Sequence, residues 1–205
     1  MNIYDRYLMP LLIDACCGLK DIQAQRAQLL PRARGKVLEI GIGTGRNLAF
    51  YDPAKLTSLQ GLDPAPQMSG KAQKRARAAG LNVELITLSA ERIPAPDATY
   101  DTVVCTFTLC TIPDPVTALR QMRRVLKPGG ELLFCEHGRS PEASVQRWQD
   151  RLTPWWKPLA GGCHLNRDVR TMLRHGGFVP TQVESGYLNG PKPLVYVTRG
   201  VALAD

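Results

Sequence analysis

The chain has 205 residues, of which 44% are hydrophobic and 21% charged, and its formal net charge is +8. This length suits a single domain, and the composition is that of an ordinary soluble globular protein. No stretch reaches the roughly 18 uncharged apolar residues that a membrane span requires. Acids and a proline interrupt the N-terminal segment where a secretory signal has its apolar core, so we expect a retained N-terminus and a cytoplasmic protein.

Six cysteines stand at positions 16, 17, 105, 110, 135 and 163, and none of them forms a CxxC motif. Cys105 and Cys135 lie in strand-like apolar runs, where a free cysteine behaves as a small hydrophobe. We therefore expect reduced thiols and no bound metal. The basic residues gather at 71–80 and 119–127, which indicates solvated helix faces, with an anionic membrane surface or nucleic acid as alternatives. No RNA-binding or helix-turn-helix motif is present, so no nucleic-acid partner is expected.

Strand-like and helix-like segments alternate along most of the chain. Residues 3–30 have the pattern of two helices packed ahead of a sheet, and the alternation from residue 36 onward predicts parallel βαβ units. KPGG at 127–130 and Gly176–Gly177 each end a helix and begin a strand. The predicted strands are 36–41, 57–63, 82–87, 100–107, 130–137, 179–185 and 193–199. The predicted helices include 67–79, 114–126 and one within 169–178 that Gly176–Gly177 stop.

The stretch VLEIGIGTGRNL (37–48) places an acid and three alternate glycines at the end of the first predicted strand. Glycine adopts positive φ without strain and lets a ligand approach the backbone, so this loop is expected to open a helix beneath a ligand. Asp63 ends the next strand, and adjacent strand ends form the ligand crevice of a doubly wound sheet. An acid there accepts both hydroxyls of a ribose, which indicates a nucleoside cofactor.

The spacing of the loop favours one nucleoside cofactor over another. A dinucleotide site has G-x-G-x-x-G, whereas this loop reads G-x-G-x-G and carries Arg46 at the third-glycine position. Glu39 lies two residues before the loop, where a carboxylate repels a pyrophosphate and suits a cationic cofactor with an amino group. S-adenosylmethionine meets these conditions with its ribose, its amino-acid part and its sulfonium.

Four stretches in order, VLEIGIGTG, GLDPAPQM, SAERIPAPDATYDTVVC and VLKPGGELLFCEHG, resemble the successive motifs of class I S-adenosylmethionine-dependent methyltransferases over residues 36–138. The resemblance implies a Rossmann-like, doubly wound, seven-stranded α/β sheet, mostly parallel with a reversed C-terminal strand and helices on both faces. It implies one domain over 1–205, with a helical cover (1–33), a cofactor-binding core (34–138) and an acceptor-side lid with the last strands (139–205). The cofactor-binding residues it implies are Glu39, Gly41, Gly43, Gly45, Asn47, Asp63, Pro64, Met68, Ala90, Glu91 and Thr106.

The second half is similar to the methyltransferase-like 7 proteins, which methylate small alkyl thiols and resemble the ubiquinone methyltransferases. The matching residues are Glu136-His137, Trp148-Gln149, Gly162-Cys163, Leu165 and Arg167. This resemblance implies S-methylation of a small apolar thiol. N-, O- or C-methylation of a lipid amine, phenol or quinone is the alternative, and an RNA-directed methyltransferase or an inactive cofactor-binding regulator is less favoured.

Methyl transfer from a sulfonium needs in-line alignment more than acid–base help, and a free thiol with a pKa near 8.5 ionises readily. His137, at the end of a strand, and His164, beside Cys163, are the candidate bases or thiolate-stabilising groups. We expect Cys110 to line the acceptor pocket.

Two aromatic segments are candidates for enclosing the acceptor. Trp148 and Trp155 lie in RWQDRLTPWWKPL (147–159), which we interpret as a lid over the acceptor, with core packing or a peripheral membrane contact as alternatives. Tyr4 and Tyr7, in the N-terminal cover, are expected to touch the cofactor or the acceptor.

Overall fold

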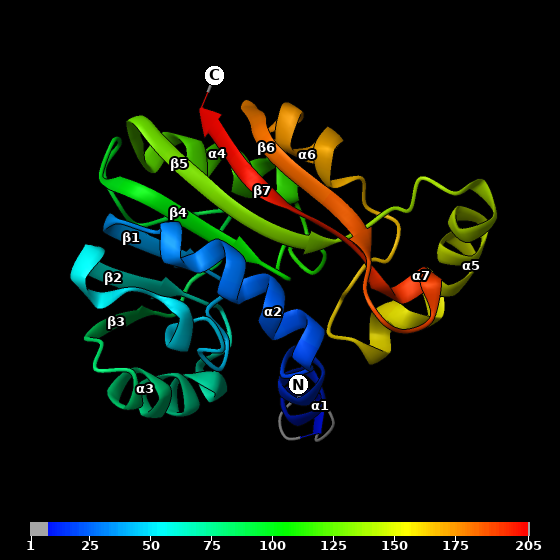
Figure 1. Cartoon of the computed structure of the whole chain (residues 1–205), viewed down its shortest axis with the longest axis horizontal. Coiled ribbons are helices and arrows are strands. Elements are labelled where there is room, and N and C mark those ends of the chain that lie inside the picture. Colours follow the sequence, from blue (N-terminus) through cyan, green and yellow to red (C-terminus); the bar gives the residue numbers. More distant parts are fainter. Residues whose placement is uncertain (1–7, 205) are drawn as a thin grey trace.

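The computed structural model describes residues 8–204, which form a seven-stranded sheet with helices on both faces (Figure 1). The strand order is β3-β2-β1-β4-β5-β7-β6, and β1 to β5 pair in parallel whereas β7 is antiparallel to both of its neighbours. This arrangement confirms the predicted fold class. The strands are β1 (Gly35–Ile40), β2 (Leu56–Leu62), β3 (Val83–Ile86), β4 (Tyr100–Thr106), β5 (Leu126–His137), β6 (Phe178–Tyr187) and β7 (Tyr196–Ala204).

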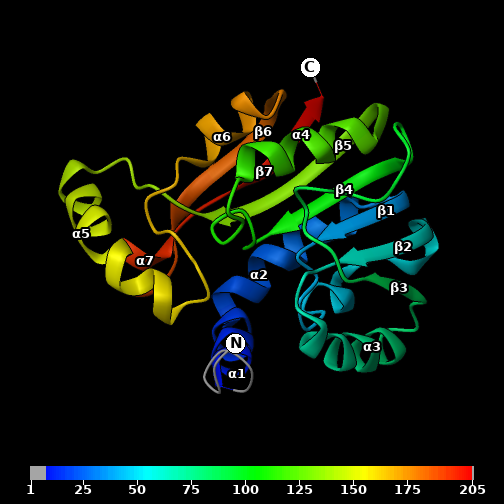
Figure 2. The same cartoon turned by 180° about the vertical axis from the view of Figure 1, so that it is seen from behind.

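Seven α-helices accompany the strands within residues 8–204. In Figure 1, α2 crosses the near face of the sheet, and Figure 2 shows α4 and α6 on the opposite face. No helix in this range combines the length and the apolar character that crossing a bilayer demands. The helices are α1 (Met9–Cys17), α2 (Lys20–Leu29), α3 (Ser69–Ala78), α4 (Pro115–Val125), α5 (Ala143–Leu159), α6 (Val169–His175) and α7 (Lys192–Val195).

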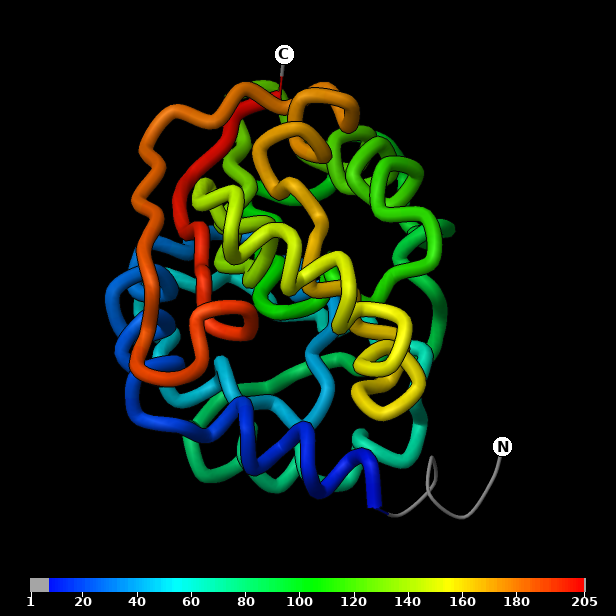
Figure 3. The backbone as a smooth tube through the Cα atoms, turned by 90° about the vertical axis from the view of Figure 1, so that its right-hand side faces the viewer, coloured from blue at the N-terminus to red at the C-terminus, as the bar shows by residue number. Residues whose placement is uncertain are grey.

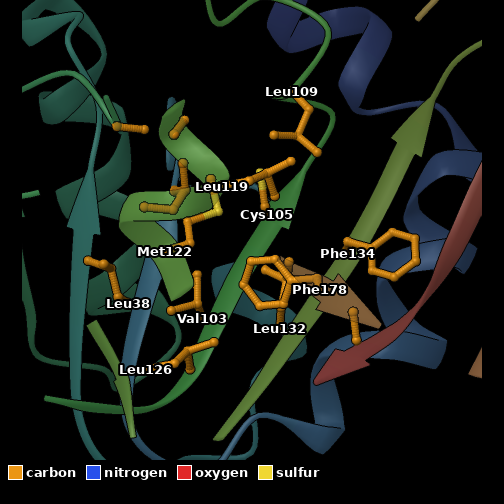
Figure 4. Close-up of a cluster of buried hydrophobic side chains, with 14 of the residues drawn as sticks. Leu38, Val103, Cys105, Leu109, Leu119, Met122, Leu126, Leu132, Phe134 and Phe178 are labelled. Atoms are coloured by element: carbon orange, nitrogen blue, oxygen red, sulfur yellow. The ribbon is translucent and has the colours of Figure 1, made fainter. Parts of the chain in front are cut away.

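Helix α4 shows how the sequence produces one of the two hydrophobic layers. Asp114 precedes the helix and accepts a hydrogen bond from the Thr117 backbone at 3.0 Å, which satisfies an N-terminal N–H group. Leu119 and Met122 are three residues apart, so they share one face, and both are fully buried against the sheet. Figure 4 shows these two side chains directed at the strand residues around Val103. A second buried cluster fills the opposite face beneath α2 and α3.

Three element predictions need correction. The glycine loop opens only a 3-10 turn, Leu48–Phe50, because the Asn47 and Tyr51 side chains are drawn to Glu39 and Pro53 has no N–H to continue a helix. β5 begins at Leu126 rather than at residue 130, because Leu126 already pairs with Tyr100 and KPGG bulges out before the next pair, Thr102 with Glu131. The last strand runs over 196–204 instead of 193–199, preceded by the single turn of α7.

The strand order reverses at the centre of the sheet, where β1 lies between β2 and β4. After β1 the chain continues to β2 on one side, and after β4 it continues to β5 on the other side. The connections therefore diverge and leave a crevice at the C-terminal ends of β1 and β4. The predicted cofactor residues follow these strand ends. The fold therefore brings the end of β1, the end of β2 and the end of β4 to one place.

Candidate active site

A pocket of about 290 Å³ opens at the reversal point, over the C-terminal ends of β1, β2 and β4. Its walls come from the glycine loop, the loops after β2, β3 and β4, the first two helices, and the turn after α5. Of the predicted cofactor residues, nine line it: Glu39, Gly41, Gly43, Asn47, Asp63, Pro64, Met68, Ala90 and Thr106.

The three glycines of the loop differ in backbone conformation and in their surroundings. Gly41 has a φ of +66°, and a Cβ there would meet the Thr108 side chain at 2.3 Å, so only glycine fits. Gly43 has a φ of +52°, and its nearest neighbour would be the Met68 sulfur at 3.5 Å, which leaves its backbone open to a ligand. Gly45 lies outside the pocket wall, because it packs against Ala72 of α3.

Glu39 is the buried acid that the sequence made conspicuous, with a side chain only 1% exposed. It accepts hydrogen bonds from Asn47 Nδ2 at 3.0 Å and from the Tyr51 hydroxyl at 2.8 Å. Burial nonetheless raises the pKa of Glu39 to about 7, because these two donors do not replace its lost hydration. Asn47 also donates to Thr106 Oγ1 at 3.0 Å, which joins the ends of β1 and β4.

Asp63 holds the glycine loop in shape from the end of β2. Its Oδ2 accepts from the Gly43 N–H at 2.9 Å and its Oδ1 from the Ala65 N–H at 2.8 Å. Burial raises the pKa of Asp63, and the two backbone donors oppose that rise. A carboxylate can accept further hydrogen bonds beyond these two, so Asp63 retains capacity for a ligand hydroxyl.

Helix α1 contributes a residue that sequence reasoning missed. Asp14 lies in the apolar segment LLIDACC and accepts from Thr44 Oγ1 at 2.6 Å, Arg46 Nε at 2.8 Å and Arg75 Nη1 at 2.9 Å. Burial alone would raise the pKa of Asp14, but these donors hold it well below its usual range. The bonds fasten α1 to the glycine loop and to α3. The only sequence signal was an acid inside an apolar run, here in a helix and at Glu39 in a strand.

Arg26 of α2 was also missed, because the polar sequence KDIQAQRAQL reads as a solvated helix. Its side chain is 3% exposed, donates from Nε to Asn47 Oδ1 at 2.8 Å, and lies 5.2 Å from the centroid of the Phe107 ring. Nη1 donates to the Cys17 carbonyl at 2.7 Å. A guanidinium is thus buried in the wall of the pocket, beside Glu39 and its partner amide.

Glu91 does not line the pocket. It accepts from the Asp114 N–H at 2.9 Å and from Ser89 Oγ at 2.7 Å, so it connects the loop after β3 to the start of α4. Ser89 takes its place in the wall, next to Ala90. On the far side, the loop after β4 supplies a mainly apolar surface together with α1 and the turn after α5. That surface consists of Met9, Ile13, Phe107, Thr108, Thr111, Ile112, Pro113 and Gly161.

The structure places neither predicted base in the pocket wall. His137 ends β5 with its Nε2 3.0 Å from the Cys163 sulfur, a contact that raises the histidine pKa against the lowering effect of burial. The backbone and Nδ1 of His164 both face the Cys110 carbonyl, at 2.9 and 3.1 Å. Cys110 is buried behind the wall, in hydrogen-bond contact with Cys163, and that contact together with burial raises its pKa.

The tryptophan segment does not enclose the pocket. Helix α5 is anchored by buried Gln149, which donates to the Gly138 carbonyl at 2.9 Å and accepts from the Ser140 N–H at 3.0 Å. That anchoring turns Trp148 and Trp155 outward, where they are 56% and 77% exposed, and neither belongs to the pocket wall. Tyr4 and Tyr7 lie outside the described residues.

Known proteins are similar to this chain in sequence and in fold. Residues 38–134 match the family model described as a methyltransferase domain. The thiol S-methyltransferase TMT1B of Homo sapiens is 34% identical over 178 residues, 83% of this chain and 70% of that protein. The Rattus norvegicus protein is 35% identical over 154 residues, 72% of this chain, and the match spans 62% of that relative's length.

Two further similarities extend the comparison. The demethylmenaquinone methyltransferase of Deinococcus radiodurans is 34% identical over 115 residues, 56% of this chain and 48% of that protein. The structure of a geranyl diphosphate methyltransferase in complex with S-adenosylmethionine has a TM-score of 0.69, with 15% identity over 88% of this chain and 84% of the other, which shows the shared fold. The chain belongs to the class I S-adenosylmethionine-dependent methyltransferases.

Proposed function

We propose that this protein transfers a methyl group from S-adenosylmethionine to the sulfur of a small apolar thiol. The similarity to the thiol S-methyltransferases supports this acceptor class. The observation that carries the proposal is the makeup of the pocket wall. Among the described lining residues there is no histidine and no lysine, and the surface on the side of the β4 loop is mainly apolar.

The residues present fit the cofactor. Gly43 leaves an open cradle, since a Cβ at this position would have no neighbour nearer than 3.5 Å, and Asp63 retains acceptor capacity beside it for the two ribose hydroxyls. Glu39, with its raised pKa, gains from a cationic partner because an ammonium group favours its ionised form. Pro64, Met68 and Ala90 supply apolar contacts for the adenine. When bound, the cofactor supplies an electrophilic methyl group on a sulfonium.

The acceptor side offers orientation and a buried positive charge rather than a base. Asp14 and Asp63 already accept hydrogen bonds from neighbouring groups, and Glu39 is engaged by Asn47 and Tyr51. A phenol or an alkyl amine has a pKa near 10 and needs a base, whereas a thiol with a pKa near 8.5 ionises without one. The Arg26 guanidinium in the wall favours the thiolate form of an acceptor bound nearby.

The test is release of S-adenosylhomocysteine from purified protein with matched acceptors: an alkyl thiol, a phenol and a primary amine of equal carbon number, between pH 6.5 and 9. We expect turnover on the thiol that rises with its thiolate fraction. Arg26→Gln should lower turnover more at pH 7 than at pH 9, because high pH supplies the thiolate that the guanidinium otherwise favours. Arg151→Gln, on the exposed face of α5, is the matched control. Cofactor binding without turnover on any thiol would refute the proposed acceptor.

A quinone or phenol acceptor is the second candidate, favoured by the similarity to the demethylmenaquinone methyltransferase. Exposed apolar side chains on α1 and α5, including Leu11, Leu12, Trp155 and Leu159, support a peripheral membrane contact through which an apolar acceptor would arrive. We propose this peripheral membrane contact only for the case in which the acceptor is a quinone or phenol. Adding vesicles to the assay should raise turnover on a long-chain phenol and leave turnover on a short alkyl thiol unchanged.

A further inference from the structure

Three soft or borderline ligands converge behind the pocket, from three separate parts of the fold. Cys110 lies in the loop after β4, His137 ends β5, and Cys163 lies in the turn between α5 and α6. Their sulfur and imidazole nitrogen atoms all lie within 4.8 Å of one another. The cluster is not explained by the pocket, because none of the three residues lines it.

The backbone around the cluster is fixed by hydrogen bonds and by glycines. The His164 N–H donates to the Cys110 carbonyl at 2.9 Å, which binds the turn after α5 to the loop after β4. Gly162, directly before Cys163, adopts a φ of +89°, a conformation that is strained for any residue other than glycine. At Gly138 a Cβ would meet the Arg167 carbonyl at 2.4 Å, so a glycine is required for the end of β5 to approach this turn. The donors are therefore held in place before any ligand binds.

The donor set is that of a thiophilic cation. Cysteine sulfur and imidazole nitrogen are the ligands that zinc prefers, and tetrahedral zinc keeps such atoms roughly 3.5–3.8 Å apart. The contact of 3.0 Å between His137 and Cys163, and the upper limit of 4.8 Å for the others, require only small side-chain adjustments to reach that geometry.

The surroundings of the cluster also suit a metal ion. The Trp156 indole N–H donates to the Cys163 sulfur at 3.3 Å, the kind of outer hydrogen bond that orients and tunes a thiolate ligand. Two thiolates balance the charge of a divalent cation, so the ion with these ligands would add no net charge to a region where Cys110 and Cys163 are 3% and 8% exposed.

We propose that Cys110, His137 and Cys163 bind one zinc ion, with water in the fourth position. Figure 3 views the molecule from the side on which α5 and the following turn lie. Thr111 and Gly161, each within two residues of a ligand, belong to the pocket wall. The ion would thus join the two loops that form the acceptor side, and its binding does not depend on the identity of the acceptor.

The test uses the full chain, reduced and stripped of metal, titrated with Co²⁺ and then with Zn²⁺. We expect one Co²⁺ per chain, a thiolate-to-cobalt charge-transfer band, the visible bands of tetrahedral cobalt, and displacement of cobalt by zinc. Cys110→Ser, His137→Gln and Cys163→Ser should each weaken binding by more than about 10-fold. Cys16→Ser, which alters an exposed thiol outside the cluster, should leave it unchanged.

A second measurement uses the unaltered protein, so its result does not depend on whether the variants fold. Alkylation followed by mass spectrometry should show that zinc slows modification of Cys110 and Cys163 but not of Cys16. The absence of a cobalt spectrum from the reduced protein would overturn the proposal. So would an unchanged affinity in Cys163→Ser, or alkylation rates that do not respond to zinc.

Discussion

Removal of the buried charge of Glu39 is expected to raise the stability of the cofactor-free protein and to weaken cofactor binding. Glu39→Gln keeps the shape of the side chain and removes its charge. The amide oxygen can accept from Asn47 Nδ2, and the amide N–H can donate to the Tyr51 hydroxyl oxygen, so both present hydrogen-bond contacts of the buried side chain are retained.

The magnitude follows from the pKa of Glu39, which burial raises from 4.5 to about 7. The folded state favours the protonated acid, so this contribution to stability is fully present below pH 4.5 and is lost as the pH rises through 7. Each pH unit in that window costs about 1.4 kcal/mol, which sums to about 3 kcal/mol. The neutral amide has no such dependence. Relative to the wild type, Glu39→Gln should therefore gain about 2–3 kcal/mol between pH 5 and pH 8.

The assay is urea unfolding of both cofactor-free proteins at pH 5 and pH 8. Glu136, another buried acid with a pKa raised to about 7 by burial, is present in both proteins and cancels in the difference. Glu131→Gln makes the same chemical change at a half-exposed position of β5. Calorimetric titration should show that Glu39→Gln binds S-adenosylmethionine at least about 10-fold more weakly, since a charge-assisted contact is lost. Equal stability differences at the two pH values would refute the reasoning.

Three further changes test the loop and its supports. Asp63→Asn should weaken cofactor binding by about 10-fold to 100-fold, measured by calorimetry, because the bond to the Gly43 N–H loses its charge; unchanged affinity would contradict this role. Gly41→Ala should lower the free energy of unfolding by more than about 1 kcal/mol because its φ is +66°, whereas Gly70→Ala, in α3 with open space around it, should raise it by about 0.5–1 kcal/mol. Asp14→Asn should speed proteolysis within α1, since it weakens the attachment to the glycine loop; an unchanged cleavage rate would show that α1 is held by other contacts.

The order of strands and helices was predictable from the sequence because apolar periodicity and glycine breakers are local signals. Burial of Leu119 and Met122 on one face of α4 follows from their spacing. The predicted cofactor loop left an equally local signal, since three alternate glycines follow one strand and an acid ends the next. Gly43 and Asp63 accordingly meet in the structure at a hydrogen bond of 2.9 Å.

Side-chain direction at the ends of elements was not predictable in this way. His137 and Trp155 were expected at the acceptor, yet the first turns to Cys163 and the second points outward, because buried Gln149 fixes the rotation of α5. The helices α3, α4 and α6 were predicted, whereas the directions of the His137 and Trp155 side chains were not. Such facing depends on a few long-range hydrogen bonds that leave no periodic trace.

The sequence by itself determined the alternation of strands and helices, the glycine loop and the acid that follows it, because each depends on neighbours a few residues away. Only the tertiary structure decided that Arg26 and Asp14, from helices ahead of the sheet, enter the pocket wall. It also decided that Cys110 and Cys163, 53 positions apart, come together with His137. The physical reason is that these side chains are positioned by contacts between distant segments, which form only when the sheet, its helices and its loops have packed together.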